Sequence, residues 1–387
     1  LPTLLACWTR SGMLARAIGK RAWPAGTQKR YAALVRQAAR LARPDGSLAG
    51  ADPALADPSL LRAAAKVADD QAASVALGKR LRPRQKASRK WPASPLPPAA
   101  SSEWSDVSVL AAGWKPKAPQ ITVACDGSHL SIELASRGRV VLAGDWPVLG
   151  TIDSKPFSVA GPWERQCWFS DEHCDYLELS IQLSGGGRLE RQVFLARHDR
   201  VGFLAEAWLG GSSAARRVEQ QMSLPLAAGA SFSPEAETRD GWLVAGKKPT
   251  AGVVPLALPE WRAERRVGEL LSTGGRLELT QQAVGRNAHQ PLMLDFRPSR
   301  FARQRTWRKL AVAQQLKNVP PDVAAGYRMQ SGDDQWLVYR SLAAAANRTV
   351  LGGNFACETV IGRFLPTGEI EEYCHVDAES RQAPHTA

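Results

Sequence analysis

The stretch Asp175-Tyr-Leu-Glu-Leu-Ser-Ile-Gln-Leu183, followed by Ser184-Gly-Gly-Gly187, decides the fold that we expect for this chain. Leucine or isoleucine occupies every second position from 177 to 183, and polar side chains stand between them. Strict alternation of this kind is typical of an antiparallel strand that buries one face and exposes the other. The glycine run predicts a hairpin turn, so we expect residues 188–196 to return as the partner strand.

The two-residue period continues through the rest of the chain from Trp104 onward. We expect further strands at 120–124, 129–135, 139–146, 201–209, 216–224, 241–245, 253–258, 275–284, 290–297, 308–316, 334–342, 348–353 and 358–364. Roughly fourteen short strands separated by polar turns predict a mainly β protein built as a large antiparallel β-sandwich, or super-sandwich. No alternation of strands with helices competes with this interpretation.

The beginning of the chain has the period of helices instead. Apolar side chains recur at intervals of three and four residues in 4–18, 28–42 and 58–77. Such stripes predict amphipathic helices, and Pro44-Asp-Gly46 predicts a turn after the second one. Residues 1–78 therefore predict helical hairpins that precede the sandwich.

Positive charge is concentrated between these two parts. Residues 1–103 contain 18 Lys and Arg against 6 acidic residues, so this first quarter of the chain holds almost all of the net charge of +13. A basic run at 79–90 gives way to a stretch rich in Pro, Ala and Ser, which is typical of a linker. We therefore expect a helical segment at 1–78, a basic and Pro-rich linker at 79–103, and a β-sandwich domain at 104–387.

Composition excludes several classes of protein. No run of eighteen apolar residues occurs among the 387, so we expect no membrane span. The six cysteines form no CxxC pair, so we expect buried thiols, of which two or four could form one or two disulfides. We expect neither a metal site nor a cofactor. The start at Leu1 lacks the flanks of a lipoprotein signal around Cys7, and we expect the chain to be a fragment of a longer protein.

The order of these parts, helical hairpins and then a long antiparallel domain, resembles the C-terminal half of heparinase II/III-like proteins, in which an incomplete α/α toroid precedes a β-sandwich. The tail is more similar to uncharacterised bacterial members than to the characterised lyases. The stretches that carry the resemblance are Tyr31-Ala-Ala-Leu-Val-Arg-Gln-Ala-Ala-Arg-Leu41, Arg43-Pro-Asp-Gly46, the strand pair from Arg191 to Glu206, Gln335-Trp-Leu-Val-Tyr-Arg-Ser-Leu342 and Asn347-Arg-Thr-Val-Leu-Gly352.

The resemblance implies a protein that acts on acidic polysaccharides, as a polysaccharide lyase working by β-elimination. It also implies a location in the periplasm or outside the cell. Members of the family use a tyrosine and a histidine as base and acid, and the characterised ones carry a His-Asn-Thr-like stretch that this sequence lacks. We therefore assign no catalytic residue, and the alternative is a catalytically inactive carbohydrate-binding or structural surface protein.

Two groups of residues are candidates for contact with such a polysaccharide. The basic run could neutralise a polyanion or be a solvated linker, and it lacks the interleaved aromatic residues of a nucleic-acid site. Two tryptophans that flank an arginine in the sandwich could stack on sugar rings, although a large sandwich also buries most of its tryptophans, and 10 of the 13 in this chain follow residue 103. The candidate binding residues are Arg80, Arg82, Arg84, Lys86, Trp163, Arg165 and Trp168.

Asp171-Glu-His-Cys-Asp175 gathers acids, a histidine and a thiol just before the best strand. Neighbouring residues of an extended chain point to opposite faces, so they cannot all converge on one ion. We expect a polar loop that caps a hairpin, in preference to a metal site. His198-Asp199 could be part of a hydrolytic triad, but the sequence has no Gly-x-Ser-x-Gly elbow to supply the nucleophile. We therefore expect a polar turn between two strands at His198-Asp199.

Overall fold

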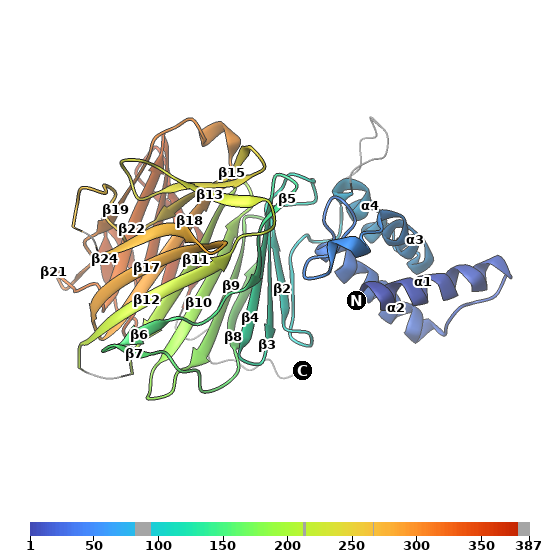
Figure 1. Ribbon diagram of the computed structural model, residues 1–387, viewed down its shortest axis with the longest axis horizontal. Helices are drawn as coiled ribbons and strands as arrows, with labels where there is room; N and C mark the ends of the chain where they lie inside the picture. The colour runs from blue at the N-terminus through green and yellow to red at the C-terminus, as the bar shows by residue number, and fades with distance from the viewer. Residues whose placement is uncertain (82–93, 212–213, 266, 378–387) are drawn as a thin grey trace. The chain divides into compact units, whose positions relative to one another are not determined.

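The computed structural model describes residues 1–81, 94–211, 214–265 and 267–377. The chain divides into two compact units (Figure 1): unit 1 comprises residues 1–123 and 133–139, and unit 2 comprises 124–132 and 140–387. The protein is mainly β and its paired strands are antiparallel, which confirms the predicted fold class. The predicted boundaries at residues 78 and 104 stay predictions. None of the helices in the described part of the chain is long and apolar enough to cross a membrane.

Unit 1 contains the helices. They are α1 (Pro2–Ala17), α2 (Ala25–Leu41), α3 (Pro58–Ala68) and α4 (Gln71–Arg80), with a 3-10 turn η1 (Pro53–Leu55). The prediction of a single helix at 58–77 is wrong, because two consecutive aspartates divide this segment into α3 and α4. Asp69 adopts a left-handed conformation with φ of 55° and ends α3. Asp70 then caps α4 by accepting a hydrogen bond from the backbone N–H of Ala73 at 2.8 Å.

The core of unit 1 forms where α1, α2 and α3 pack together. Tyr31 is fully buried, and its hydroxyl shares a hydrogen bond of 2.8 Å with the hydroxyl of Thr9. Gly12 interrupts the apolar stripe of α1 because a Cβ atom there would collide with Val67. The glycine therefore allows α1 to approach α3 closely.

The remaining elements are strands. Five strands form a sheet in chain order: β1 (Ala100–Ser102), β2 (Val107–Ala111), β3 (Gln120–Asp126), β4 (His129–Ser136) and β5 (Arg139–Asp145). The largest sheet has the order β13 (Ala230–Pro234), β14 (Gly241–Ala245), β15 (Lys248–Pro255), β18 (Asn287–Asp295), β11 (Val201–Leu209), β10 (Arg188–Ala196), β9 (Cys174–Gln182) and β8 (Glu164–Ser170), and we call it the central sheet.

Two five-stranded sheets and a smaller one complete unit 2. One sheet has the order β16 (Gly268–Thr273), β17 (Arg276–Gly285), β12 (Arg216–Pro225), β6 (Gly150–Ile152) and β7 (Lys155–Pro156). The other has the order β19 (Arg305–Leu310), β22 (Ala324–Ser331), β23 (Asp334–Ser341), β26 (Thr359–Phe364) and β27 (Ile370–Val376). The smaller sheet has the order β21 (Lys317–Asn318), β20 (Ala313–Gln314), β24 (Arg348–Val350) and β25 (Gly353–Phe355), and η2 (Pro298–Arg300) is a 3-10 turn.

The central sheet is covered on both faces. On one face the side-chain amide of Gln290 in β18 donates to the carbonyl of Gln220 in β12 at 3.2 Å. On the other face Arg340 in β23 donates to Glu178 in β9 at 3.0 Å. Unit 2 is therefore a sandwich of three layers. We call the sheet that contains β12 the first covering sheet and the sheet that contains β23 the second covering sheet.

This three-layer arrangement corrects the prediction for the strand at 175–183. The sequence predicts a half-buried strand, but every residue of β9 up to Ile181 is buried, including the polar ones. Glu178 and Ser180 lie against the second covering sheet instead of facing water. Glu178 is fully buried because Arg340 neutralises it.

The predicted hairpin after this strand is confirmed. Strands β9 and β10 pair with Leu189 opposite Ile181, and Gly185, Gly186 and Gly187 all have φ near 90°, at 90°, 92° and 86°. Only glycine adopts this conformation without steric cost. The strand predicted at 308–316 is divided, because β19 stops pairing at Leu310 and β20 begins at Ala313.

Candidate functional site: an arginine-lined pocket

The residues predicted to bind polysaccharide do not meet in one described place. Arg80 is only 2% exposed, and its guanidinium lies 5.3 Å from the ring centroid of Trp114 within unit 1. Burial lowers its pKa to about 10. Arg82, Arg84 and Lys86 lie outside the described residues.

The predicted tryptophan pair lies at the edge strand β8 and at the residue before it. Trp163 is buried, and its indole N–H donates to the carbonyl of Ser128 at 3.1 Å. Trp168 and Arg165 are half-buried. A sugar could reach Trp168 more readily than Trp163, and binding by any of the three stays a prediction.

Trp163 belongs to a buried stack around Arg191. The guanidinium of Arg191 lies 4.3 Å from the ring centroid of Trp146 and 4.7 Å from that of Trp163. It also donates to Glu206 at 2.7 Å, and both side chains of this ion pair are fully buried. Burial raises the pKa of Glu206 and lowers that of Arg191, because it disfavours the charged form of each side chain. The ion pair between them offsets part of this desolvation cost. We interpret this stack as part of the core.

The acidic stretch 171–175 is a capped turn, as predicted. Asp171 accepts hydrogen bonds from the backbone N–H groups of His173 and Cys174, both at 2.8 Å. Asp175 points elsewhere and pairs with Arg197 at 2.5 Å. Within the described ranges no cluster of His, Cys, Asp and Glu could hold a metal ion, and the six cysteines are free thiols.

An arginine-lined pocket of about 400 Å³ forms where η2 and its flanking residues meet the β22–β23 turn and β26. Four guanidinium groups and two carboxylates surround it, so its lining is polar and carries an excess of positive charge. We call it the arginine pocket, and its lining residues are Arg297, Ser299, Arg300, Arg303, Asp333, Asp334 and Arg363.

Two of these arginines are held in place by acids. Arg300 is 1% exposed and binds Asp295 through two nitrogen atoms, with the shortest distance 2.6 Å. It also donates to the carbonyl of Asp199 at 2.8 Å. Arg363 pairs with Asp334 at 2.5 Å and with the carboxylate of Asp199 at 3.2 Å. These bonds use most of the donors of Arg300 and one donor from each terminal nitrogen of Arg363, and they make one wall of the pocket rigid.

The other two arginines are unpaired. The guanidinium groups of Arg297 and Arg303 form no ion pair and no hydrogen bond with any described residue. Arg303 is exposed, and its side chain lies against Gly332, where a Cβ atom would come within 2.6 Å of its Cδ atom. Two guanidinium groups are thus free to bind an anion at the rim of the pocket.

Asp199 organises the wall behind the pocket. Its carboxylate accepts hydrogen bonds from the indole N–H of Trp336 at 2.8 Å and from the hydroxyl of Tyr373 at 2.7 Å, in addition to the contact with Arg363. Burial, reinforced by Asp199, raises the pKa of Tyr373 well above its usual value. Tyr373 therefore stays protonated at neutral pH and keeps its hydroxyl hydrogen in the bond to Asp199.

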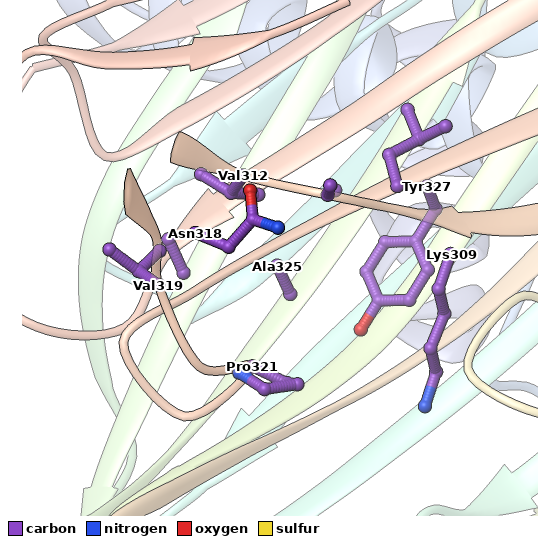
Figure 2. Close-up of a pocket in the computed structure, with 11 residues that line it drawn as sticks. Lys309, Val312, Asn318, Val319, Pro321, Ala325 and Tyr327 are labelled. Carbon is purple, nitrogen blue, oxygen red and sulfur yellow. The ribbon is translucent and has the colours of Figure 1, made fainter. Parts of the chain in front are cut away.

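A second cavity lies in the covering sheet at the end of β19 (Figure 2). It encloses about 220 Å³, and its walls are mostly aliphatic. Tyr327 and Lys309 are opposite one another on β22 and β19 and form one side, while Asn318 lies across from them. Its lining contains no acid, which makes it chemically unlike the arginine pocket.

The sequence contained a signal for the arginine pocket that our prediction missed. Arg297, Arg300 and Arg303 recur every third residue. In a 3-10 turn residues three apart lie above one another, which fits Arg297 and Arg300 at the start and end of η2, whereas Arg303 follows the turn. Arg363 comes from a distant strand, and no local pattern could have joined it to them.

Solved structures with a similar fold are polysaccharide lyases. A heparan sulfate lyase from Pedobacter heparinus is 11% identical over 89% of this chain and 59% of its own, with a TM-score of 0.56. A heparinase III is 10% identical over 88% of this chain and 59% of its own, with a TM-score of 0.57. This chain thus spans about three-fifths of their length, and at this identity the likeness concerns the fold alone. No protein-family model matches the sequence, and no curated protein is significantly similar to it.

Proposed function

We propose that this protein binds acidic polysaccharides and that the arginine pocket holds a carboxylate or sulfate group of the glycan. The two unpaired guanidinium groups of Arg297 and Arg303 beside a pocket of about 400 Å³ carry this proposal. Guanidinium forks match the geometry of carboxylate and sulfate oxygens, and an unpaired fork gains most from such a partner. The likeness to the fold of heparan sulfate lyases supports the same class of ligand.

Arg300 and Arg363 have a different role in this proposal. Their donors are already engaged by Asp295, Asp334 and Asp199, which neutralise them, so they shape the pocket without being the main contacts. A bound sugar acid would therefore face two free cations on one side and a fixed wall on the other.

The test is retention of the protein on immobilised heparan sulfate at increasing salt. The double variant Arg297→Glu/Arg303→Glu should bind about a hundredfold more weakly, since each lost charge-assisted contact contributes roughly tenfold. The matched control is Lys247→Glu/Lys248→Glu, which makes the same change of charge at an exposed turn outside the pocket. Equal weakening in both double variants would mean that net charge and not the pocket binds the glycan.

The basic linker is a separate candidate contact and can be tested in the same assay. Charge reversal at Arg82, Arg84 and Lys86 tests the role predicted from the sequence. Binding that survives this change but is lost in the pocket variant assigns the glycan to the pocket. Loss in the linker variant alone would contradict our proposal.

Cleavage by β-elimination is the second candidate, and the fold likeness to lyases favours it. An active lyase releases unsaturated uronate products, which are followed by their ultraviolet absorbance. Absence of this signal on heparan sulfate that the protein demonstrably binds would favour the catalytically inactive, carbohydrate-binding alternative.

A further inference from the structure

The second cavity exists because β19 leaves its neighbour β22 early. Pairing between them ends at Leu310 opposite Gly326, although β22 begins two residues earlier, at Ala324. The start of β22, which β19 leaves unpaired, has only small side chains, and a Cβ atom on Gly326 would lie 3.3 Å from the Cβ of Leu310. Together with residues 309–312, 318, 319 and 321, these small residues line a half-open cavity of about 220 Å³.

The walls of this cavity are apolar. Aliphatic side chains and a proline form most of the surface, and the ring of Tyr327 closes one side, as Figure 2 shows. The aliphatic and proline lining residues are Leu310, Val312, Val319, Pro321, Ala324 and Ala325. Such walls favour a compact apolar body, and an apolar cavity of about 150 Å³ is known to hold a benzene ring.

One charged group lines the cavity. Lys309 has no ion pair or side-chain hydrogen bond with a described residue. The nearest acid in sequence to the lining, Asp322, is engaged by the backbone N–H of Arg286 at 2.9 Å and by its guanidinium at 3.4 Å. The ammonium group therefore stands beside an apolar cavity without a compensating carboxylate.

The Tyr327 wall carries no charge of its own. His289 packs behind it with ring centroids 5.6 Å apart, and it is only 3% exposed. Burial lowers the pKa of His289 to about 3, so the imidazole is neutral at physiological pH. Lys309 alone sets the charge that a ligand would meet.

We propose that this cavity binds a small monocarboxylate with a single aromatic or alicyclic ring. The ring would occupy the aliphatic space against Tyr327, and the carboxylate would pair with the ammonium group of Lys309. The amide of Asn318, across the cavity, can donate a further hydrogen bond to an oxygen of the ligand. This site is separate from the arginine pocket and does not depend on glycan binding.

The experiment is a calorimetric titration of the whole protein with benzoate and with its neutral analogue benzamide. We expect benzoate to bind at least tenfold more tightly than benzamide, because a charge-assisted hydrogen bond is stronger than a neutral one. Lys309→Met should lose at least tenfold in benzoate affinity and leave benzamide unchanged. Lys317→Met, at an exposed lysine of β21 that does not line the cavity, is the matched control and should bind benzoate as the wild type does.

Ala325→Leu fills the cavity and should abolish binding of both molecules, with folding checked by thermal melting. If this variant fails to fold, the comparison of Lys309→Met with Lys317→Met still decides. The proposal is overturned if benzoate does not bind the wild type at millimolar concentration, if benzamide binds equally well, or if Lys309→Met retains full affinity.

Discussion

Replacing Arg340 by methionine should remove the cation that neutralises two buried glutamates of the central sheet. Its guanidinium donates to Glu178 at 3.0 Å, to the hydroxyl of Thr359 at 2.6 Å, and also to Glu190. The side chain of Arg340 is 1% exposed and both glutamates are 0% exposed. Burial alone lowers the pKa of Arg340, but the two glutamates more than offset this, and its pKa is raised. The folded protein therefore favours the charged form of Arg340.

The loss should be large. Removing one partner of a buried ion pair costs about 3–5 kcal/mol, and here Glu178 loses Arg340 while Glu190 keeps its ion pair with Arg188 at 2.8 Å. Methionine keeps much of the volume, so the electrostatic loss dominates over any cavity. We expect the free energy of unfolding to fall by about 5 kcal/mol, which is a large share of the 5–15 kcal/mol typical of a folded domain.

The loss should also depend on pH. Without Arg340 burial disfavours the charged form of the two carboxylates, whereas the glutamates of the unfolded chain are exposed to water. The folded variant then binds more protons than the unfolded chain, and its stability falls as pH rises. We therefore expect the difference from the wild type to shrink between pH 7 and pH 5.

Urea unfolding monitored by tryptophan fluorescence measures these differences. Arg328→Met is the matched control: this arginine on β22 is half-buried and has no ion pair with a described residue, so its loss should change stability by at most about 0.5 kcal/mol. The triple variant with Glu178→Gln and Glu190→Gln should recover at least half of the loss. A cost below about 1 kcal/mol for Arg340→Met, or a triple variant no better than the single one, would refute the reasoning.

Two further predictions concern stability. Asp70→Ala should lower the free energy of unfolding of the helices by at least about 1 kcal/mol, because it removes both the cap at the start of α4 and the ion pair of Asp70 with Arg36 at 2.5 Å. Thermal melting followed by circular dichroism measures this, and an unchanged melting curve would contradict the stabilising role of Asp70. The folded-state pKa of His289, about 3, is far below its unfolded value of about 6.5, so the unfolded chain binds an extra proton between these values. Its contribution to stability is complete above pH 6.5 and should decline by about 1.4 kcal/mol per pH unit as pH falls toward 3. His289→Leu should remove this slope in urea unfolding at several pH values, and an identical slope in both proteins would exclude His289 as its source.

Local patterns in the sequence were enough to predict the mainly β fold. Residue alternation depends only on which way successive side chains point, so β11 and β14 were predicted with their observed bounds, 201–209 and 241–245. The glycine hairpin at 184–187 followed from steric limits on the backbone that hold in any protein. The break between α3 and α4 depended on two adjacent aspartates whose capping role the apolar stripe concealed.

The candidate sites required the tertiary structure. Alternation implied that Glu178 faces water, but the second covering sheet brings Arg340 over it, and a contact between residues 162 positions apart has no local signature. The arginine pocket likewise joins the 297–303 stretch to Arg363 through Asp334 and Asp199. The sequence by itself therefore determined the period, the turns and the charge of each segment, because these depend on neighbouring residues. Only the packing of the sheets decided which charges are buried in pairs and which, such as those of Arg297 and Arg303, remain free for a ligand.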